Sequence, residues 1–495
     1  MKSHCDIVLI NPGGRSEAYQ DLSNDLAAIE PPLWLALVGR YLQQKSWAVE
    51  IIDADAEALT ASQVAQRVGE ASPILAVIFA YGANPSASTQ KMPVVRLIAQ
   101  QIKDSLPALP LALGGVHVSA LPERTLTEEP CDFAIQGEGF RTLDALLACL
   151  QAGGQELEKV AGLWFRRDGQ VTHTPPAPLL KDLDADLDGG AWDLLPMAGY
   201  RAHNWHCFDR LDRRSPYAAI YTSFGCPFNC SFCCINAPFG GSGIRYRGVA
   251  SVLAEIDLLV SRYGVTNIKI ADELFVLKPE RVRAICQGLI ERNYGLNIWA
   301  YARVDTVAPD LLDKLKQAGV NWLAYGFESA VASVRLEASK RFEDETVERA
   351  IALTRQAGIY IIANYIFGLP EDDYHTMAAT LQAAMVHDFE FANFYCAMAY
   401  PGSRLYEQAI KEHWALPEAW AGYSQLGYET LPLPTKHLSA QQVLNFRDRA
   451  FVKFFADRSY QERIERQFGP EAKRHIQQML AVNIRRRHAE STEIR

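Results

Sequence analysis

The stretch Cys226-Pro-Phe-Asn-Cys230-Ser-Phe-Cys233 places three thiols at spacings of four and three residues within one short loop. A strand-like run, Ala218 to Thr222, precedes it. A glycine-rich stretch from Gly240 to Gly243 and a helical pattern from Val249 follow it. A strand, a cysteine loop and a helix in this order favour a metal held at the carboxyl-terminal mouth of a parallel barrel.

Thiolates at these spacings predict a four-iron, four-sulfur (4Fe-4S) cluster on Cys226, Cys230 and Cys233. Such clusters usually take four thiolates, but Cys234 follows Cys233 directly and adjacent side chains project apart. Three ligands leave one iron open to bind a small molecule. A structural zinc site is less favoured, because the sequence has no second CxxC-like pair. A disulfide is weaker still, since ten scattered cysteines indicate a reducing compartment.

The chain has 495 residues, too many for one ordinary core, so about two to four domains are expected. Its apolar content is typical of a globular protein. The net charge of −9 disfavours a nucleic-acid partner, because phosphate binding requires a basic face. The apolar run Ile7 to Ile10 is too short for a signal peptide, and no stretch is long enough to span a membrane. A cytoplasmic location is therefore expected.

Residues 1–150 alternate strand and helix signals, which predicts a doubly wound parallel sheet. Ligands of such sheets bind at the carboxyl ends of the strands. A generic nucleotide site is disfavoured there, because the sequence has no GxGxxG or P-loop motif. Any one small-residue turn could be an ordinary tight turn, but four at one sheet edge favour a flat, bulky ligand. The expected strands are 5–11, 49–53, 75–80, 111–115 and 133–136, and the turns are 11–14, 82–84, 114–117 and 137–139.

Residues 151–215 are expected to form a linker containing a hairpin that turns at Asp168-Gly169. From 216 to 400 the strand–helix rhythm returns, and six repeats predict a partial (β/α)6 barrel with a lateral opening. Its strands are expected at 218–222, 267–271, 296–300, 322–327, 360–367 and 391–397. Polar loop residues are more often solvated than functional, so four linker residues are only weak candidates for a substrate pocket: His203, Trp205, His206 and Asp209.

Residues 401–495 lose this rhythm and are expected to form a helical cap that closes the barrel and shapes the substrate pocket. A capping box at Ser439 indicates the start of a helix that runs to about Asp457. The basic run Arg485 to Arg487 is expected to lie in a solvated tail, frayed from Ala489 on.

The cysteine loop resembles the radical S-adenosylmethionine (radical SAM) superfamily, whose CxxxCxxC motif it matches at Cys226, Cys230 and Cys233. In that family the open iron binds the amino and carboxylate groups of S-adenosylmethionine, and one electron then yields a 5′-deoxyadenosyl radical. The resemblance implies S-adenosylmethionine contacts on or after the barrel strands: Phe232, Asp272, Glu273, Arg303, Glu328, Gly368 and Glu371.

Two of these matches are imperfect. The family usually has Gly-Gly-Glu after the second strand, whereas this chain has Ala271-Asp272-Glu273, so either acid could make the contact. The first glycine of the family's GxIxGxxE motif is Asn364 here. Strand-end carboxylates also often cap the next helix, and for Arg303 a structural role and a functional role remain equally open.

The first domain resembles the cobalamin-binding domain that precedes the barrel in one radical SAM class. The resemblance implies cobalamin contacts in the strand-end turns, at Asn11, Gly82, Gly114, Gly115, His117, Gly137, Glu138 and Gly139. The DxHxxG motif that supplies a cobalt-binding histidine elsewhere is missing, which implies cobalamin without a protein histidine on cobalt and favours methyl transfer. His117 is more simply interpreted as a turn histidine that bonds backbone or corrin amides.

These features imply a cobalamin-dependent radical SAM enzyme with a small-molecule substrate. The expected reaction is methyl transfer to an unactivated carbon, or less often to phosphorus. Two alternatives remain: an oxidative cyclase or rearranging enzyme of the same architecture, and a non-catalytic cobalamin or metal sensor. The expected partner is an electron donor such as flavodoxin or ferredoxin.

Overall fold

The computed structural model describes residues 5–82 and 84–488. Its first sheet has the strand order β2-β1-β3-β4-β5-β6-β7, and the first five of these strands are parallel. Alternate residues of β1 face two separate cores: Ile7 and Leu9 contact one apolar cluster, and Val8 and Ile10 contact the other. A sheet covered on both faces is doubly wound, as predicted. The strands are β1 (Ile7–Asn11), β2 (Val49–Asp53), β3 (Leu75–Ala80), β4 (Leu111–Gly115), β5 (Phe133–Ile135), β6 (Leu163–Arg167) and β7 (Gln170–His173).

Helices cover both faces of this sheet. The helices α2 (Leu33–Gln44) and α7 (Phe140–Gln151) belong to one core, and α3 (Ala61–Ala71) and α4 (Met92–Ser105) belong to the other. The hairpin β6–β7 pairs antiparallel with β5, so the predicted hairpin forms but extends the first sheet instead of lying in a separate linker. The domain divisions at 150, 215 and 400 stay predictions.

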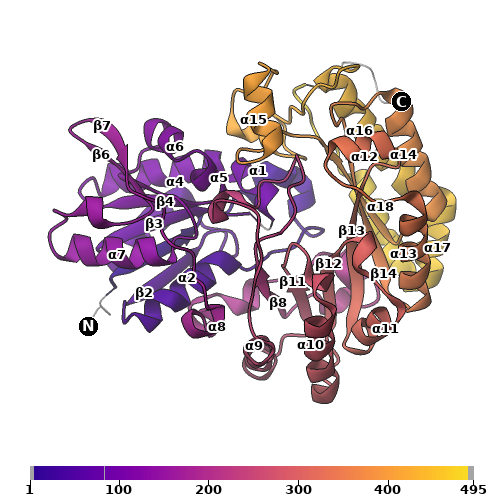
Figure 1. The fold of residues 1–495 in the computed structure, drawn as a ribbon, viewed down its shortest axis with the longest axis horizontal. Helices are drawn as coiled ribbons and strands as arrows, with labels where there is room; N and C mark the ends of the chain where they lie inside the picture. Colours follow the sequence, from indigo (N-terminus) through magenta and orange to yellow (C-terminus); the bar gives the residue numbers. More distant parts are fainter. Residues whose placement is uncertain (1–4, 83, 489–495) are drawn as a thin grey trace.

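The second sheet is parallel throughout, with the order β15-β14-β13-β12-β11-β8. The six expected strands all form, and β8 and β15 are the two edges of this partial barrel. Figure 1 shows the two sheets on opposite sides of the molecule, with the barrel helices outside the second. The strands are β8 (Tyr217–Ile220), β11 (Asn267–Ile270), β12 (Asn297–Ala302), β13 (Val320–Glu328), β14 (Tyr360–Phe367) and β15 (Phe391–Cys396), and the helices are α9 (Val249–Tyr263), α10 (Pro279–Arg292), α11 (Pro309–Gln317), α13 (Asp344–Gln356) and α14 (Tyr374–His387).

The segment between the sheets closes the amino-terminal end of the barrel. The indole of Trp205 contacts the rings of Trp299 and Trp322, which lie early in β12 and β13. The buried ring of His206 lies 3.1 Å from the backbone oxygen of Asn297, whose side-chain amide donates back to the His206 carbonyl at 2.8 Å. His206 therefore has a structural role.

The C-terminal residues connect the two halves. Here lie α15 (Arg404–Lys411), η12 (Trp420–Tyr423), α16 (Ala440–Phe455), α17 (Arg458–Phe468) and α18 (Pro470–Ala481). The capping box at Ser439 forms, and α16 packs on β15. The segment η12 packs instead on the first domain, where Arg124 lies 4.2 Å from the Trp420 ring. Figure 1 shows α15 over the space between the halves.

The expectation of a solvated basic run at 485–487 is wrong for its middle residue. The guanidinium of Arg486 is 3% exposed and binds both carboxylate oxygens of Asp448 at 2.9 Å. It also donates to the carbonyls of Gln425 and Gly427, so it anchors the end of the described chain to the cap. The region from Ala489 lies outside the described residues. Within the described ranges, no helix has the length and apolar character needed to cross a bilayer.

Candidate active site between the two sheets

A cavity of about 460 Å³ lies between the barrel, the first domain and the cap. Its walls include the side chains of Cys226, Cys230 and Cys233, together with residues of the inner face of the barrel. Tyr19 and Glu30 of the first domain also line it. The cysteine loop and the domain that resembles a cobalamin-binding fold therefore share one cavity.

The cysteine loop is closed at its base by a short antiparallel ribbon of β9 (Ser223–Phe224) and β10 (Arg245–Tyr246). Gly225 has φ +85°, and a Cβ there would lie 2.5 Å from the Gly243 carbonyl oxygen, so this crossing requires glycine. The ribbon is fastened to the first domain, because Arg245 binds the Glu138 carboxylate at 2.5 Å.

The three cysteines suit an iron–sulfur cluster by chemistry and access. All three are free thiols that line the cavity, and burial raises the pKa of Cys226 to about 11. The sulfurs are not preassembled: no group of three or more metal-binding side chains comes together anywhere in the described chain. Cys234 is buried in an apolar cluster with Met398 and Tyr400, as expected for a side chain that projects away from the loop.

Of the two acids after β11, only Glu273 reaches the cavity. The carboxylate of Asp272 is buried and accepts three bonds of 2.6 Å, from the backbone and hydroxyl of Thr222 and from the hydroxyl of Ser223. It ties the end of β11 to the end of β8. Burial raises the pKa of Glu273 to about 7.

Arg303, after β12, lies beside the cysteine loop. Its guanidinium is 4.1 Å from the centre of the Phe228 ring and binds Asp305 through two bonds of 2.9 Å. Both Arg303 and Phe232 line the cavity.

Glu328, at the end of β13, has an unusual backbone. It has φ +62° next to a break in register with β14, a conformation that costs a non-glycine residue free energy and is often found at functional sites. Its carboxylate is buried and paired with Lys340, whose ammonium also donates to the Gly326 carbonyl at 2.9 Å.

The GLPE stretch after β14 lies beside the cavity rather than on it. The Gly368 amide donates to the Asp372 carboxylate at 3.0 Å, and a Cβ on Gly368 would collide with Val443 of α16. Glu371 is half-exposed and paired with Lys436. The structure thus brings four of the seven expected S-adenosylmethionine residues to the cavity wall, Phe232, Glu273, Arg303 and Glu328, and leaves Asp272, Gly368 and Glu371 off it.

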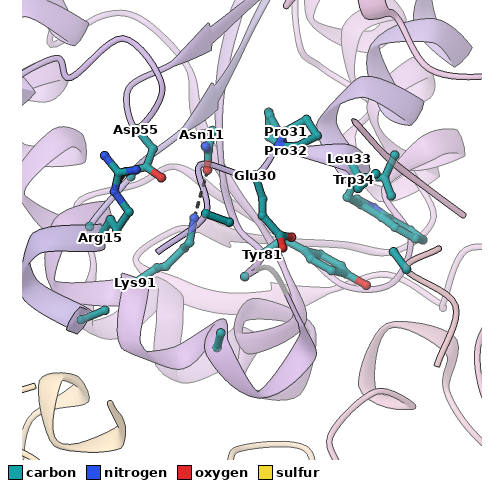
Figure 2. Close-up of a pocket in the computed structure, with 18 of the residues that line it drawn as sticks. Asn11, Arg15, Glu30, Pro31, Pro32, Leu33, Trp34, Asp55, Tyr81 and Lys91 are labelled. Carbon is teal, nitrogen blue, oxygen red and sulfur yellow. Dashed lines mark hydrogen bonds and ion pairs between the residues drawn. The ribbon is translucent and has the colours of Figure 1, made fainter. Parts of the chain in front are cut away.

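A second cavity, of about 90 Å³, lies at the carboxyl ends of β1 and β3. Figure 2 shows Lys91 donating to Asn11, at 3.1 Å, beside Arg15 and Asp55. Asn11 and Gly82 are the expected cobalamin residues that line this cavity. The others lie outside its wall: Gly114, Gly115, His117, Gly137, Glu138 and Gly139.

His117 is a structural residue. Its ring is 3.1 Å from the Thr89 hydroxyl and meets the Trp420 ring edge-on at 4.6 Å. Burial lowers its pKa to about 3, so the imidazole is neutral. Gly115 is required by the backbone, because it has φ +111° and a Cβ there would lie 2.4 Å from the Ala80 carbonyl oxygen.

Eight residues line both cavities, and among them are three that the sequence did not single out as a set: Glu30, His203 and Lys269. Lys269, inside the barrel, binds Glu30 of the first domain at 2.8 Å and lies 5.1 Å from the Trp299 ring. A lysine inside the apolar run of β11 was the one available signal. Of the weak linker candidates, His203 and Trp205 reach the larger cavity, whereas His206 and Asp209 do not.

The comparisons with known proteins agree with this architecture. Residues 20–147 match the B12 binding domain family and residues 220–384 match the radical SAM superfamily, together more than half of the chain. A Pyrococcus horikoshii protein named as an uncharacterised methyltransferase is 29% identical over 428 residues, 86% of this chain and 88% of that protein.

A second relative and a solved structure extend the comparison. The anaerobic magnesium-protoporphyrin IX monomethyl ester cyclase of a Synechocystis species is 29% identical over 72% of this chain and 68% of its own length. The structure of the radical S-adenosylmethionine methyltransferase TsrM from Kitasatospora setae superimposes with a TM-score of 0.67 at 17% identity, covering 96% of this chain and 98% of that one. At this identity the likeness concerns the fold.

Proposed function

Because the chain belongs to the radical SAM enzymes that carry an N-terminal B12-binding domain, we propose that it is a cobalamin-dependent methyltransferase acting on an unactivated carbon of a small molecule. One observation carries this proposal. The three thiols of the radical SAM motif and side chains of the B12-binding domain line the same cavity, so both cofactors would act on one substrate.

The residues that would hold the cofactors follow from their positions. Cys226, Cys230 and Cys233 would bind the 4Fe-4S cluster, and the turns after β1 and β3, with Asn11 and Gly82, would receive cobalamin. When bound, the cluster and S-adenosylmethionine supply a carbon-centred radical, and cobalamin supplies the methyl group. The protein orients these groups and keeps water from them.

S-adenosylmethionine would be held by the strand-end residues that line the cavity. The Glu273 carboxylate would accept hydrogen bonds from its amino group, and the Arg303 guanidinium would bind its carboxylate. Phe232 and Glu328 would contact the nucleoside. Asp272 and Gly368 would act as positioning residues, because their own bonds fix the ends of β11 and β14.

A cyclisation without methyl transfer is the second candidate, because the Synechocystis cyclase is as similar in sequence as the methyltransferase-named relative, over a smaller share of the chain. S-adenosylhomocysteine is formed only by methylation, so product analysis separates the two reactions. A cytoplasmic location and a flavodoxin or ferredoxin as electron donor remain part of the proposal, since reductive cleavage needs one electron from outside the chain.

The test is anaerobic purification, reconstitution with iron, sulfide and cobalamin, and mass spectrometry of the products formed with S-adenosylmethionine and a reductant. We expect a brown protein that retains corrinoid and forms 5′-deoxyadenosine. The variant Cys230→Ala should lose the colour and this product, whereas Cys234→Ala should keep both. A colourless protein, or a fully active Cys230→Ala, would contradict the proposal, and a sensor would form no 5′-deoxyadenosine.

A further inference from the structure

A buried guanidinium lies at one end of the larger cavity, where β15 and the cap form the wall. Arg447 of α16 lines the cavity and is 5% exposed. Its Nε donates to the Phe394 carbonyl at 2.7 Å, and its Nη1 donates to Asp448 at 2.8 Å. Its Nη2 has no hydrogen-bond acceptor among residues 5–82 and 84–488.

The charges around Arg447 do not balance. Two guanidiniums, those of Arg447 and Arg486, share the single carboxylate of Asp448, and the side chains of both arginines are at most 6% exposed. Although burial opposes ionisation, the two arginines hold the pKa of Asp448 below its usual range, so this carboxylate carries one negative charge. One net positive charge is therefore left in a desolvated site, which is costly unless an anion meets it.

The other charged side chains of the cavity wall are accounted for. Each is paired with one partner of opposite charge: Glu30 with Lys269, Arg303 with Asp305, and Glu328 with Lys340. Burial lowers the pKa of His203 to about 3, so its ring is neutral. In the proposed function, Glu273 binds the amino group of S-adenosylmethionine. The unpaired positive charge therefore lies at the Arg447 end of the cavity.

The walls around this end are aromatic. Phe391 and Phe394 of β15 and Phe451 of α16 line it, with Trp299 and Trp205 at the amino end of the barrel. Tyr301 and Tyr395 also line the cavity, and their hydroxyl groups form no hydrogen bond with any described residue. Such a surface suits an apolar, flat molecule that offers oxygen acceptors at its edge.

We propose that Arg447 binds an anionic group, a carboxylate or a phosphate, of a substrate whose apolar body packs between the aromatic side chains of β12, β15 and α16. This inference rests on the proposed function only in treating the cavity as the active site. A guanidinium fixed by Phe394 and Asp448 presents its remaining edge in one orientation, so it selects the position of the anion as well as its charge.

The test uses three naphthalene probes that share one apolar body. The reconstituted protein, saturated with S-adenosylhomocysteine, is dialysed against 2-naphthylacetate, 2-naphthyl phosphate or 2-(2-naphthyl)ethylamine. We expect at least one of the two acids to bind about tenfold more tightly than the amine, and the tighter acid identifies the anion. Arg447→Met should abolish this preference, whereas Arg449→Met, an exposed arginine of the same helix, should change it by less than about twofold.

Several outcomes would overturn the proposal. The first is equal affinity for the amine and both acids, and the second is an unchanged preference in Arg447→Met. The third is a loss of S-adenosylhomocysteine affinity in that variant as large as its loss of acid affinity, which would assign the charge to the nucleoside site. Arg447→Gln, which keeps a donor for the Phe394 carbonyl, serves as the second variant if the methionine variant loses its cluster or its native melting temperature. Formation of 5′-deoxyadenosine by the unchanged protein is scored separately, so failure of the proposed function is distinguishable from failure of the anion site.

Discussion

The carboxyl group of Glu273 is expected to make S-adenosylmethionine binding depend on pH. Burial raises its pKa to about 7, so it is neutral below that pH and offers a carboxylate to the amino group of S-adenosylmethionine only above it. The affinity for S-adenosylmethionine should fall about tenfold between pH 8 and pH 6, measured by equilibrium dialysis. Glu273→Gln should bind weakly at both pH values.

The matched control for this experiment is Glu371→Gln. Glu371 belongs to the family-like GLPE stretch but is half-exposed, paired with Lys436 and off the cavity wall. Its loss should leave the pH profile unchanged. A flat profile in the unchanged protein, or the same loss in both variants, would show that Glu273 does not bind the amino group.

Individual site residues were only partly predictable. The three cysteines follow from their spacing alone, because cluster ligation demands thiols close together in one loop. The choice between Asp272 and Glu273 depends on which carboxylate Thr222 binds, and that contact is made across two strands. Arg447 carries no local signal, because an arginine on an amphipathic helix is normally solvated.

At the scale of the elements, the last position of β4 is expected to tolerate no side chain. Gly115→Ala would force a Cβ to within 2.4 Å of the Ala80 carbonyl oxygen at φ +111°. We expect a loss of roughly 3 kcal/mol in the free energy of unfolding and reduced cobalamin retention, measured by thermal unfolding and corrinoid absorbance. Gly241→Ala, where a Cβ would meet nothing within 4 Å, is the control and should unfold like the unchanged protein.

Most strands could be predicted from sequence because both sheets are parallel. A parallel strand buried on both faces is a continuous apolar run bounded by turns, and the runs at 49–53, 75–80 and 360–367 have the bounds found in the structure. The pairing of β6 with β5 could not be predicted, because a hairpin signal defines two strands but not the sheet they join.

At the scale of the whole molecule, Arg486 is expected to hold the cap in place. Arg486→Ala would leave Asp448 with one partner and would remove the side-chain donor to the Gln425 carbonyl. Removing one member of a buried ion pair typically costs about 3–5 kcal/mol, so the melting temperature should fall and proteolysis of the cap should accelerate. Arg487→Ala is the control, because its pair with Glu429 is largely exposed and screened by solvent. Equal effects of the two substitutions would contradict this role.

The ion pair between Arg245 and Glu138 joins the base of the cysteine loop to a turn of the first sheet. Arg245 also donates to the Leu180 carbonyl at 2.6 Å, and the same Glu138 carboxylate accepts from the Leu180 amide at 3.0 Å. Two binding sites that are joined by the same ion pair obey thermodynamic reciprocity. If metal binding to the loop strengthens corrin binding, corrin binding must strengthen metal binding by the same free energy. Maturation in either order would then converge on the same holoenzyme, and a half-loaded protein would be the more labile species.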